Sequence, residues 1–500
     1  MNIIVEFFGN NVYALQVVIP LVTAGLCALT KCGRTAWVLA TGASWLVFIV
    51  AIAIVASIQM TPEALYEMGG HKPPMGIEYR FDPLNSFVLL LVAFAGAVMM
   101  PYAWKSIGKE VEKSKQSLFC SMYLLCLAGL LGIVSTNDIF NVFVFLEISS
   151  LSMYTLIAMG RDRRALLAAF EYLVLGTIGA TFFLIGVGFL YIMTGTLNMT
   201  GIAEHLQDVS DPRPIQAAFA FITLGLGLKI AMFPMHIWLT NSYAYAPSFV
   251  TSFVGSTATK VSIYVFLRVI YTVFGYEYAF QESPFGVVLA VLAVAGILVG
   301  SLTAVFQNNI KRLFAFSSVA QLGYMTMGIA LATHTGLLAS TVHLANHALA
   351  KGTLFLAVGA VYYRVGGVRM ADFRGIASQM PWTMAAFVIG GLSLIGVPGT
   401  AGFISKWYLL QGLIEEGWWL IVAVIILSSL LAVIYIWKIV EVAWFSSRPD
   451  GAPAVKEVPI AMQVSLWIFA LANIYFGFET SYTVGLADTI ASSLLSGSGK

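Results

Sequence analysis

Residues 138–160 read DIFNVFVFLEISSLSMYTLIAMG and place one carboxylate, Glu147, in the middle of an apolar segment. Only apolar or small polar residues lie within eight positions of it on either side. About 20 apolar residues are enough for a helix to cross a bilayer. An ionisable side chain inside such a helix is expensive and marks a functional site or a charge pair. The stretch therefore predicts a membrane-spanning helix with a proton-handling glutamate, and a structural ion pair between two helices is the alternative.

The rest of the 500-residue chain has the same character. Hydrophobic residues make up 59% of it and charged residues 10%, whereas a soluble domain carries about 25% charged residues. Lipid must be its main solvent. We expect an all-α polytopic protein of the cell (inner) membrane, with about 14 transmembrane helices. Apolar segments of suitable length are centred near residues 20, 47, 93, 126, 149, 180, 224, 260, 296, 322, 349, 395, 430 and 468.

Basic residues indicate the orientation. If the first loop, with Lys31 and Arg34, faces the cytoplasm, alternate loops on that side hold 16 of the 26 basic residues, and the opposite side holds four. By the positive-inside rule, both chain termini are then expected on the outer side. Two of the basic residues left inside spans lie near helix ends and are expected to reach water by snorkelling, and four must face protein or water. The first group is Arg268 and Lys438, and the second is Lys229, Lys260, Lys351 and Lys406.

Two prolines are expected to interrupt spans beside lysines. In TLGLGLKIAMFPMHIW, Pro234 cannot donate a backbone hydrogen bond, which frees a carbonyl next to Lys229. In LSLIGVPGTAGFISKWYLL, Pro398 frees the carbonyl of Leu394, and Lys406 follows. Broken helices at membrane depth line protein or water-filled cavities. Two such breaks, one in each half of the chain, suggest an internal repeat with ion sites near the midplane. A simple kink with a paired lysine is the alternative at Pro234.

Two further polar stripes lie in apolar segments. Lys260 ends the stretch SFVGSTATK, where Ser256 and Thr257 share its helix face, and hydroxyls beside a buried amine can hold water. The second stripe runs along HLANHALAKG at a spacing of four. Histidine titrates near neutrality and passes protons through either ring nitrogen, so this stripe predicts a proton relay, with a satisfied hydrogen-bond ladder between helices as the alternative. Its members are His343, His347 and Lys351.

Other kinds of chemistry have no support in the sequence. The six histidines are scattered and the four cysteines show no CxxC pairing, so we expect no metal site. There is no P-loop, no Rossmann glycine pattern and no paired nucleophile and base. We therefore expect no cofactor, no catalytic residue and no nucleic-acid partner. A membrane scaffold whose buried charges only pair with one another is a further alternative.

Five motifs in order, FNVFVFLE, GLKIAMFPMHIW, KVSIYVFLR, HLANHALAKG and PGTAGFISKW, resemble the proton-translocating, antiporter-like subunits. Such subunits occur in respiratory complex I, in Mrp-type sodium/proton antiporters and in energy-converting membrane hydrogenases. The resemblance covers nearly the whole chain and is nearest to the D-type component of Mrp antiporters. It implies two inverted five-helix repeats after three leading helices. The expected units are 1–115 with the leading helices, 116–275 and 276–447 with the repeats, and 448–500 with the last helix and a C-terminal tail.

The resemblance also implies a function. We expect a subunit of a multisubunit monovalent cation (Na⁺)/proton antiporter, not itself an enzyme, that works with other membrane subunits in the lipid bilayer. The alternative is the proton- or sodium-pumping module of a redox complex, either an energy-converting hydrogenase or a complex I relative. SFVGSTATK departs from the apolar stretch that the family carries before this lysine, which implies either altered hydration there or a different ion. The implied proton path consists of Glu147, Lys229, Lys260, His343, His347, Lys351 and Lys406.

Overall fold

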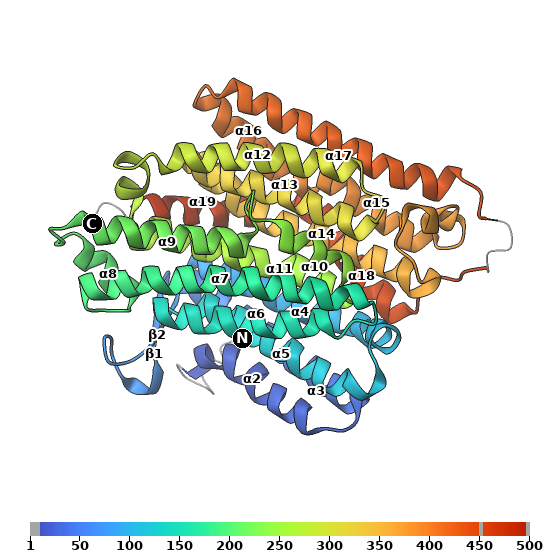
Figure 1. Ribbon diagram of the computed structural model, residues 1–500, viewed down its shortest axis with the longest axis horizontal. Coiled ribbons are helices and arrows are strands. Elements are labelled where there is room, and N and C mark those ends of the chain that lie inside the picture. The colour runs from blue at the N-terminus through green and yellow to red at the C-terminus, as the bar shows by residue number, and fades with distance from the viewer. Residues whose placement is uncertain (1–10, 450–453, 497–500) are drawn as a thin grey trace.

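The computed structural model describes residues 11–449 and 454–496, and it shows long helices that run side by side (Figure 1). Twelve of the described helices are long and apolar enough to cross a membrane. A bent pair that ends in α15 (Pro381–Ile395) raises the number to 13. The interrupted pair of α9 (Pro212–Ile230) and α10 (Ile237–Tyr245) lies where a further span was expected near residue 224.

Three helices lie at the centre of this bundle. The most apolar windows of α11, α13 and α14 are 100% buried, compared with 28% for α17. Polar residues on these three helices are therefore kept away from lipid. The remaining bounds are α2 (Val12–Leu29), α3 (Gly33–Met60), α4 (Pro83–Glu110), α5 (Gln116–Ser135), α6 (Ile139–Ala158), α7 (Arg163–Thr194), α11 (Ser248–Leu267), α12 (Phe285–Val305), α13 (Ile310–Ala330), α14 (His334–Val365), α16 (Ala401–Glu415), α17 (Trp419–Phe445) and α18 (Ile460–Phe478).

Both predicted helix breaks are present. α9 gives way to Ala231, which has a left-handed backbone (φ 62°), before α10 begins. α15 gives way to Gly396 (φ 89°) before α16 begins. Pro234 and Pro398 each lie between the two half-helices, as expected of a residue that cannot donate to a preceding carbonyl.

Two connections in the bundle repeat the same backbone hydrogen bonds. The N–H of Ile139 donates to the carbonyl of Leu197, and the N–H of Ile310 donates to that of Val368, both at 2.9 Å. Corresponding residues are separated by the same number of positions. α7 and α14 both have 32 residues and both end at a left-handed glycine. We infer that α5–α11 and α12–α17 are copies of one unit of five spans. Because five is odd, the second copy begins on the opposite side of the membrane.

Four further elements were not predicted. β1 (Ala64–Glu67) and β2 (Glu78–Phe81) pair antiparallel between α3 and α4. α8 (Met199–Leu206) follows α7. α19 (Ser481–Ser496) follows α18, where only a tail was expected, and it packs against α14.

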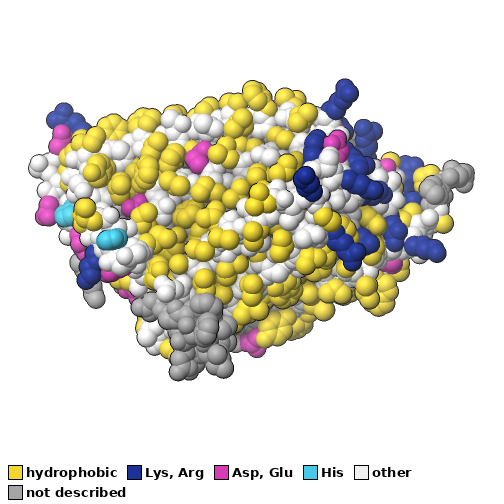
Figure 2. Space-filling view, turned by 90° about the horizontal axis from the view of Figure 1, so that it is seen from below, with side chains coloured by type: hydrophobic (Ala, Val, Ile, Leu, Met, Phe, Trp, Pro, Cys, Tyr) yellow, Lys and Arg dark blue, Asp and Glu magenta, His cyan; other side chains and the backbone are white. Residues whose placement is uncertain are grey.

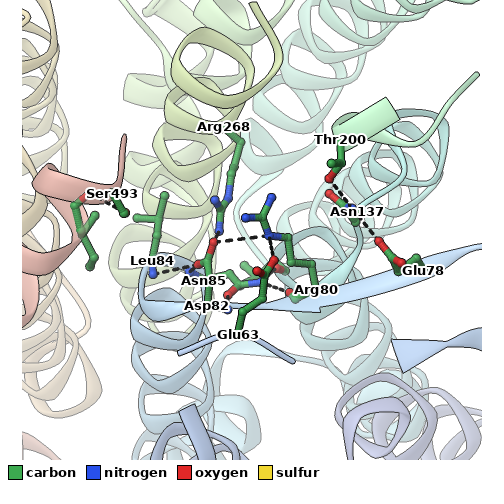
Figure 3. Close-up of polar contacts among 12 residues, drawn as sticks. Glu63, Glu78, Arg80, Asp82, Leu84, Asn85, Asn137, Thr200, Arg268 and Ser493 are labelled. Atoms are coloured by element: carbon green, nitrogen blue, oxygen red, sulfur yellow. Dashed lines mark hydrogen bonds and ion pairs between the residues drawn. The ribbon is translucent and has the colours of Figure 1, made fainter. Parts of the chain in front are cut away.

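An ion-pair cluster ties β2 to the bundle (Figure 3). Asp82 caps α4 by accepting the backbone N–H of Leu84 at 3.0 Å, and it also accepts a hydrogen bond from Arg268. Arg80 of β2 lies 2.8 Å from Glu63. The snorkelling predicted for Arg268 is wrong, because a carboxylate at the start of α4 gives its buried guanidinium a partner inside the protein.

Surface chemistry divides the molecule along its length (Figure 2). Apolar side chains cover its middle, as expected for contact with lipid or neighbouring subunits. Lys and Arg gather at one end, the end at which α17 finishes in Figure 1. This distribution agrees with the asymmetry of the loop charges in the sequence.

Candidate functional site

Glu147 on α6 and Lys229 at the end of α9 form an ion pair. Lys229 Nζ lies 3.5 Å from Glu147 Oε1 and donates to Ser150 Oγ at 2.9 Å. The Lys229 side chain is 4% exposed, whereas that of Glu147 is 23% exposed. Trp238 Nε1, beyond the break, donates to the carbonyl of Leu228 at 2.9 Å and so satisfies one carbonyl at the end of α9. The break therefore presents the lysine to α6 from a fixed helix end.

Lys260 is fully buried in α11, and its amine donates to the carbonyl of Gly255 and lies 3.4 Å from Thr259 Oγ1. The two hydroxyls expected to hold water beside this amine each donate to a carbonyl one turn back, Ser256 Oγ to that of Ser252 at 2.8 Å and Thr257 Oγ1 to that of Phe253 at 2.7 Å. Serine in a helix readily bonds a carbonyl one turn back. Among the described residues no carboxylate forms an ion pair with Lys260.

The polar stripe of α14 faces two neighbouring helices. His343 Nδ1 lies 2.8 Å from Ser405 Oγ on α16, and Lys351 donates to the carbonyl of Phe314 on α13 at 2.7 Å. The rings of His343 and His347 are parallel within 2°, with centroids 6.0 Å apart. Within the described chain, both ring nitrogens of His347 and Nε2 of His343 lack a hydrogen-bond partner. Ring nitrogens without a hydrogen-bond partner favour a proton relay over a ladder in which every polar group is already hydrogen-bonded.

Lys406 on α16 turns back towards the second break. Its amine donates to the carbonyls of Leu394 and Ile395, at 3.0 and 2.8 Å, and lies 5.1 Å from the centroid of the Tyr324 ring. The Leu394 carbonyl is the one that Pro398 deprives of a helical donor. The broken helix thus supplies oxygen ligands for a buried cation.

These side chains form a row that crosses the bundle. The helices of the row follow one another through the bundle. α9 packs against α11, α11 against α14, and α14 against α16, while α6 meets α9 through the Glu147–Lys229 pair and both pack against α7. No hydrogen bond between described residues joins Lys229 to Lys260, or Lys260 to His347, so a proton needs water or side-chain movement for those steps. The four lysines of the row are each 6% exposed or less: Lys229, Lys260, Lys351 and Lys406.

Two buried charges at the basic end were missed by the sequence reasoning. Lys311, one of the 16 basic residues expected in cytoplasmic loops, lies in the first turn of α13, is 3% exposed, and donates to the carbonyl of Ala246 at 3.0 Å. Glu110, the last residue of α4, is 7% exposed. The only signal in the sequence is that both residues border long apolar segments.

Residues 136–432 match the profile of the family described as NADH:quinone oxidoreductase/Mrp antiporter, transmembrane. The chain belongs to this family. This antiporter-like subunit is 44% identical to the N-type component of NADH-quinone oxidoreductase from Desulforudis audaxviator, over 82% of this chain and 81% of that protein. It is 28% identical to the D-type component of the Na⁺/H⁺ antiporter from Bacillus subtilis, over 97% of each. The family expected from the five motifs is confirmed.

Solved structures with the same fold come from multisubunit membrane complexes. A chain of the membrane-bound sulfane sulfur reductase, an archaeal respiratory membrane complex, aligns with a TM-score of 0.89 at 29% identity and covers 97% of this chain and 98% of that chain. A chain of the Mrp complex from Dietzia aligns with a TM-score of 0.87 at 24% identity, over 97% of each chain. Both of these chains are components of membrane complexes, and both share their fold with nearly the whole of this chain.

Proposed function

We propose that this subunit conducts protons along the buried row that crosses its centre. The observation that carries the proposal is the burial of four lysines on helices that pack next to one another, of which only Lys229 has a carboxylate partner within ion-pair distance among the described residues. Burying unpaired charge is costly. A lysine in such a place can gain or lose its proton as its surroundings change. The row is Glu147, Lys229, Lys260, His343, His347, Lys351 and Lys406.

The Glu147–Lys229 pair is the coupling element in this proposal. When the pair is closed, the carboxylate stabilises the proton on Lys229. When Glu147 moves away or is protonated, Lys229 loses that support, and its proton passes towards Lys260. Protonation of one site then changes the proton affinity of the next, so the sites titrate as a coupled set.

The proposal has two forms, which differ in the driving force for proton movement: exchange for Na⁺ or a redox reaction in partner subunits. Exchange for Na⁺ is supported by the full-length likeness to the D-type component of an Na⁺/H⁺ antiporter. Redox-driven pumping is supported by the higher identity to the N-type component of an NADH-quinone oxidoreductase and by the likeness to the sulfane sulfur reductase chain. The partner proteins discriminate between these forms, since iron–sulfur or nickel proteins that co-purify with the complex favour redox drive. In both forms we place the basic loops in the cytoplasm and both termini outside.

The test is proton translocation by the assembled complex in membrane vesicles. Glu147→Ala and Lys229→Ala are each expected to abolish translocation while the complex still assembles. Unchanged translocation in either variant at normal expression would rule out the path. If the protein were only a scaffold whose buried charges pair with one another, replacing both Glu147 and Lys229 by apolar residues would leave transport by the complex intact.

A further inference from the structure

A polar cavity of about 220 Å³ opens at the basic end of the bundle. Its walls come from the end of α4, the loops before α7, α11 and α13, and the segment after α14. It belongs to the end where basic side chains gather in Figure 2. The charged residues that line it include Glu110, Arg161, Asp162, Arg164, Lys311 and Arg369.

Glu110 lies between this cavity and the first turn of α11. Its Oε1 accepts from Ser106 Oγ at 2.7 Å, and its Oε2 accepts from the backbone N–H and Oγ of Ser248 at 2.9 and 3.0 Å. Within the described residues it takes part in no ion pair. The carboxylate thus has water-accessible space on one side and the hydroxyl of Ser248 on the other.

From Ser248 a line of hydroxyls runs along α11 at intervals of four residues and ends at Lys260. Ser248, Ser252 and Ser256 are all fully buried. Ser252 Oγ donates to the carbonyl of Ser248 at 2.9 Å, and Ser256 Oγ donates to that of Ser252 at 2.8 Å. Each oxygen still has lone pairs with which to accept a proton donor. Residues at this spacing lie about 5–6 Å apart on a helix face, a gap that one water molecule can bridge.

This serine line faces glycines of α14. A Cβ atom built on Gly352 would lie 3.0 Å from Ser256 Oγ, and one built on Gly359 would lie 3.4 Å from Ser248 Oγ. The α14 backbone therefore comes close to both hydroxyls, with Phe469 beside Gly352 and Tyr102 beside Gly359. The order of these contacts makes α11 and α14 antiparallel. The same register, continued by one turn, brings Lys260 level with the part of α14 that carries His347.

We propose that Glu110 and this serine line form the route by which protons enter the protein from its basic side. Glu110 takes a proton from water in the cavity, and the hydroxyls with intervening water pass it to Lys260. This inference rests on the proposed function and names the residues that feed the central row. A metal cation is disfavoured at this mouth, because cationic side chains outnumber carboxylates in the lining: Arg161, Arg164, Lys311 and Arg369 against Glu110, Asp162 and Asp372.

Glu110→Gln separates proton transfer from a purely structural role. Glutamine can still accept the hydrogen bonds of Ser248 and so keep α11 capped, but it cannot carry a proton. We expect the assembled complex to translocate protons about tenfold or more slowly, a modest effect beside the roughly 10²–10⁴-fold contribution of positioned proton donors and acceptors. Glu110→Asp should restore most of the rate. A Glu110→Gln complex with the wild-type rate would overturn the proposal.

Thiol labelling tests the serine line without measuring transport. Cysteine is introduced at Ser252 in a Cys32→Ser background, because Cys32 is the exposed one of the four native cysteines. A small hydrophilic methanethiosulfonate should label Ser252→Cys from the basic side only. Ser262→Cys is the matched control: the native Ser262 also bonds back one turn, to the Ala258 carbonyl, but it lies beyond Lys260. Labelling of position 252 from the opposite side, or from neither side, contradicts the route.

The two experiments distinguish failure of this route from failure of the proposed function. If wild-type complex moves no protons, the proposed function is wrong, whatever the labelling shows. Suppose instead that the wild type moves protons and that the double variant Ser252→Ala/Ser256→Ala translocates them at the same rate as the wild type and as Ser262→Ala. Only the entrance route is then wrong. We expect the double variant to be slow and Ser262→Ala to be normal.

Discussion

Lys406 donates a hydrogen bond to the carbonyl of Leu394, 3.0 Å away, and this carbonyl is the one that Pro398 leaves without a helical donor. The carbonyl freed at the helix break and the buried amine of Lys406 thus satisfy each other's need for a hydrogen-bond partner. The first break works differently, because the freed helix end holds Lys229 towards Glu147 while Trp238 bonds the carbonyl of Leu228. The two halves of the chain therefore use the same kind of break for two kinds of site.

Gly396 should be intolerant of a side chain because of its place beside Lys406. Its φ of 89° is rarely adopted by other residues, and a Cβ there would lie 2.9 Å from Lys406 Cδ. We expect Gly396→Ala to cost about 1–2 kcal/mol of stability from the backbone alone and to slow transport by displacing the amine. Gly417→Ala is the control, since Gly417 has a φ of 72° with nothing within 4 Å. Thermal melting and vesicle transport measure the two effects, and equal transport in both variants would refute the displacement.

The ion pair at the first break should be asymmetric. Glu147→Gln leaves the Lys229 amine buried without its counter-charge, whereas Lys229→Met leaves a carboxylate that is 23% exposed. Removing one partner of a buried pair costs about 3–5 kcal/mol, so we expect Glu147→Gln to lower the melting temperature more than Lys229→Met does. The double variant should melt higher than Glu147→Gln alone. Additive losses in a double-mutant cycle would show that the two residues do not interact.

The ion-pair cluster at the start of α4 should make the stability of the protein depend on pH, because Asp82 is titratable. Burial opposes ionisation of this carboxyl, but the guanidinium groups of Arg268 and Arg80 and the backbone N–H of Asn85 together outweigh burial and hold its pKa below the usual value. A lowered pKa means that the folded state favours the ionised form, so the stabilisation is complete above the unfolded pKa of about 3.9 and is lost as pH falls below it. We expect the melting temperature of the wild type to fall as the pH drops below about 4, and to fall less steeply in Asp82→Asn. Identical slopes would exclude this linkage.

The membrane fold could be predicted because its causes are local in sequence. Apolar runs of bilayer length indicated the spans, and Pro234 and Pro398 indicated the breaks, since each acts on a carbonyl one turn away. Burial of the deep lysines followed from the cost of charge in lipid. These arguments need no knowledge of which helices touch.

Features that depend on distant partners could not be predicted in this way. Arg268 is held by Asp82, 186 positions away, so its burial leaves no mark near it in the sequence. Lys311 borders an apolar run and reads as a loop residue until the carbonyl of Ala246 is placed beside it. The sequence placed Ser256 on the face of Lys260, but it did not show that the amine donates to the carbonyl of Gly255 while Ser256 Oγ donates to that of Ser252.

Proton translocation by a Lys260→Met complex in inverted vesicles tests the central claim most directly. Lys260 is fully buried at the middle of the row and has no carboxylate partner among the described residues, so methionine can replace its stem without leaving an acid unpaired. The matched control is Lys438→Met, a half-buried lysine of α17 outside the row. Our account predicts that Lys260→Met assembles normally but moves no protons, while Lys438→Met transports like the wild type. Translocation by Lys260→Met at the wild-type rate would contradict it.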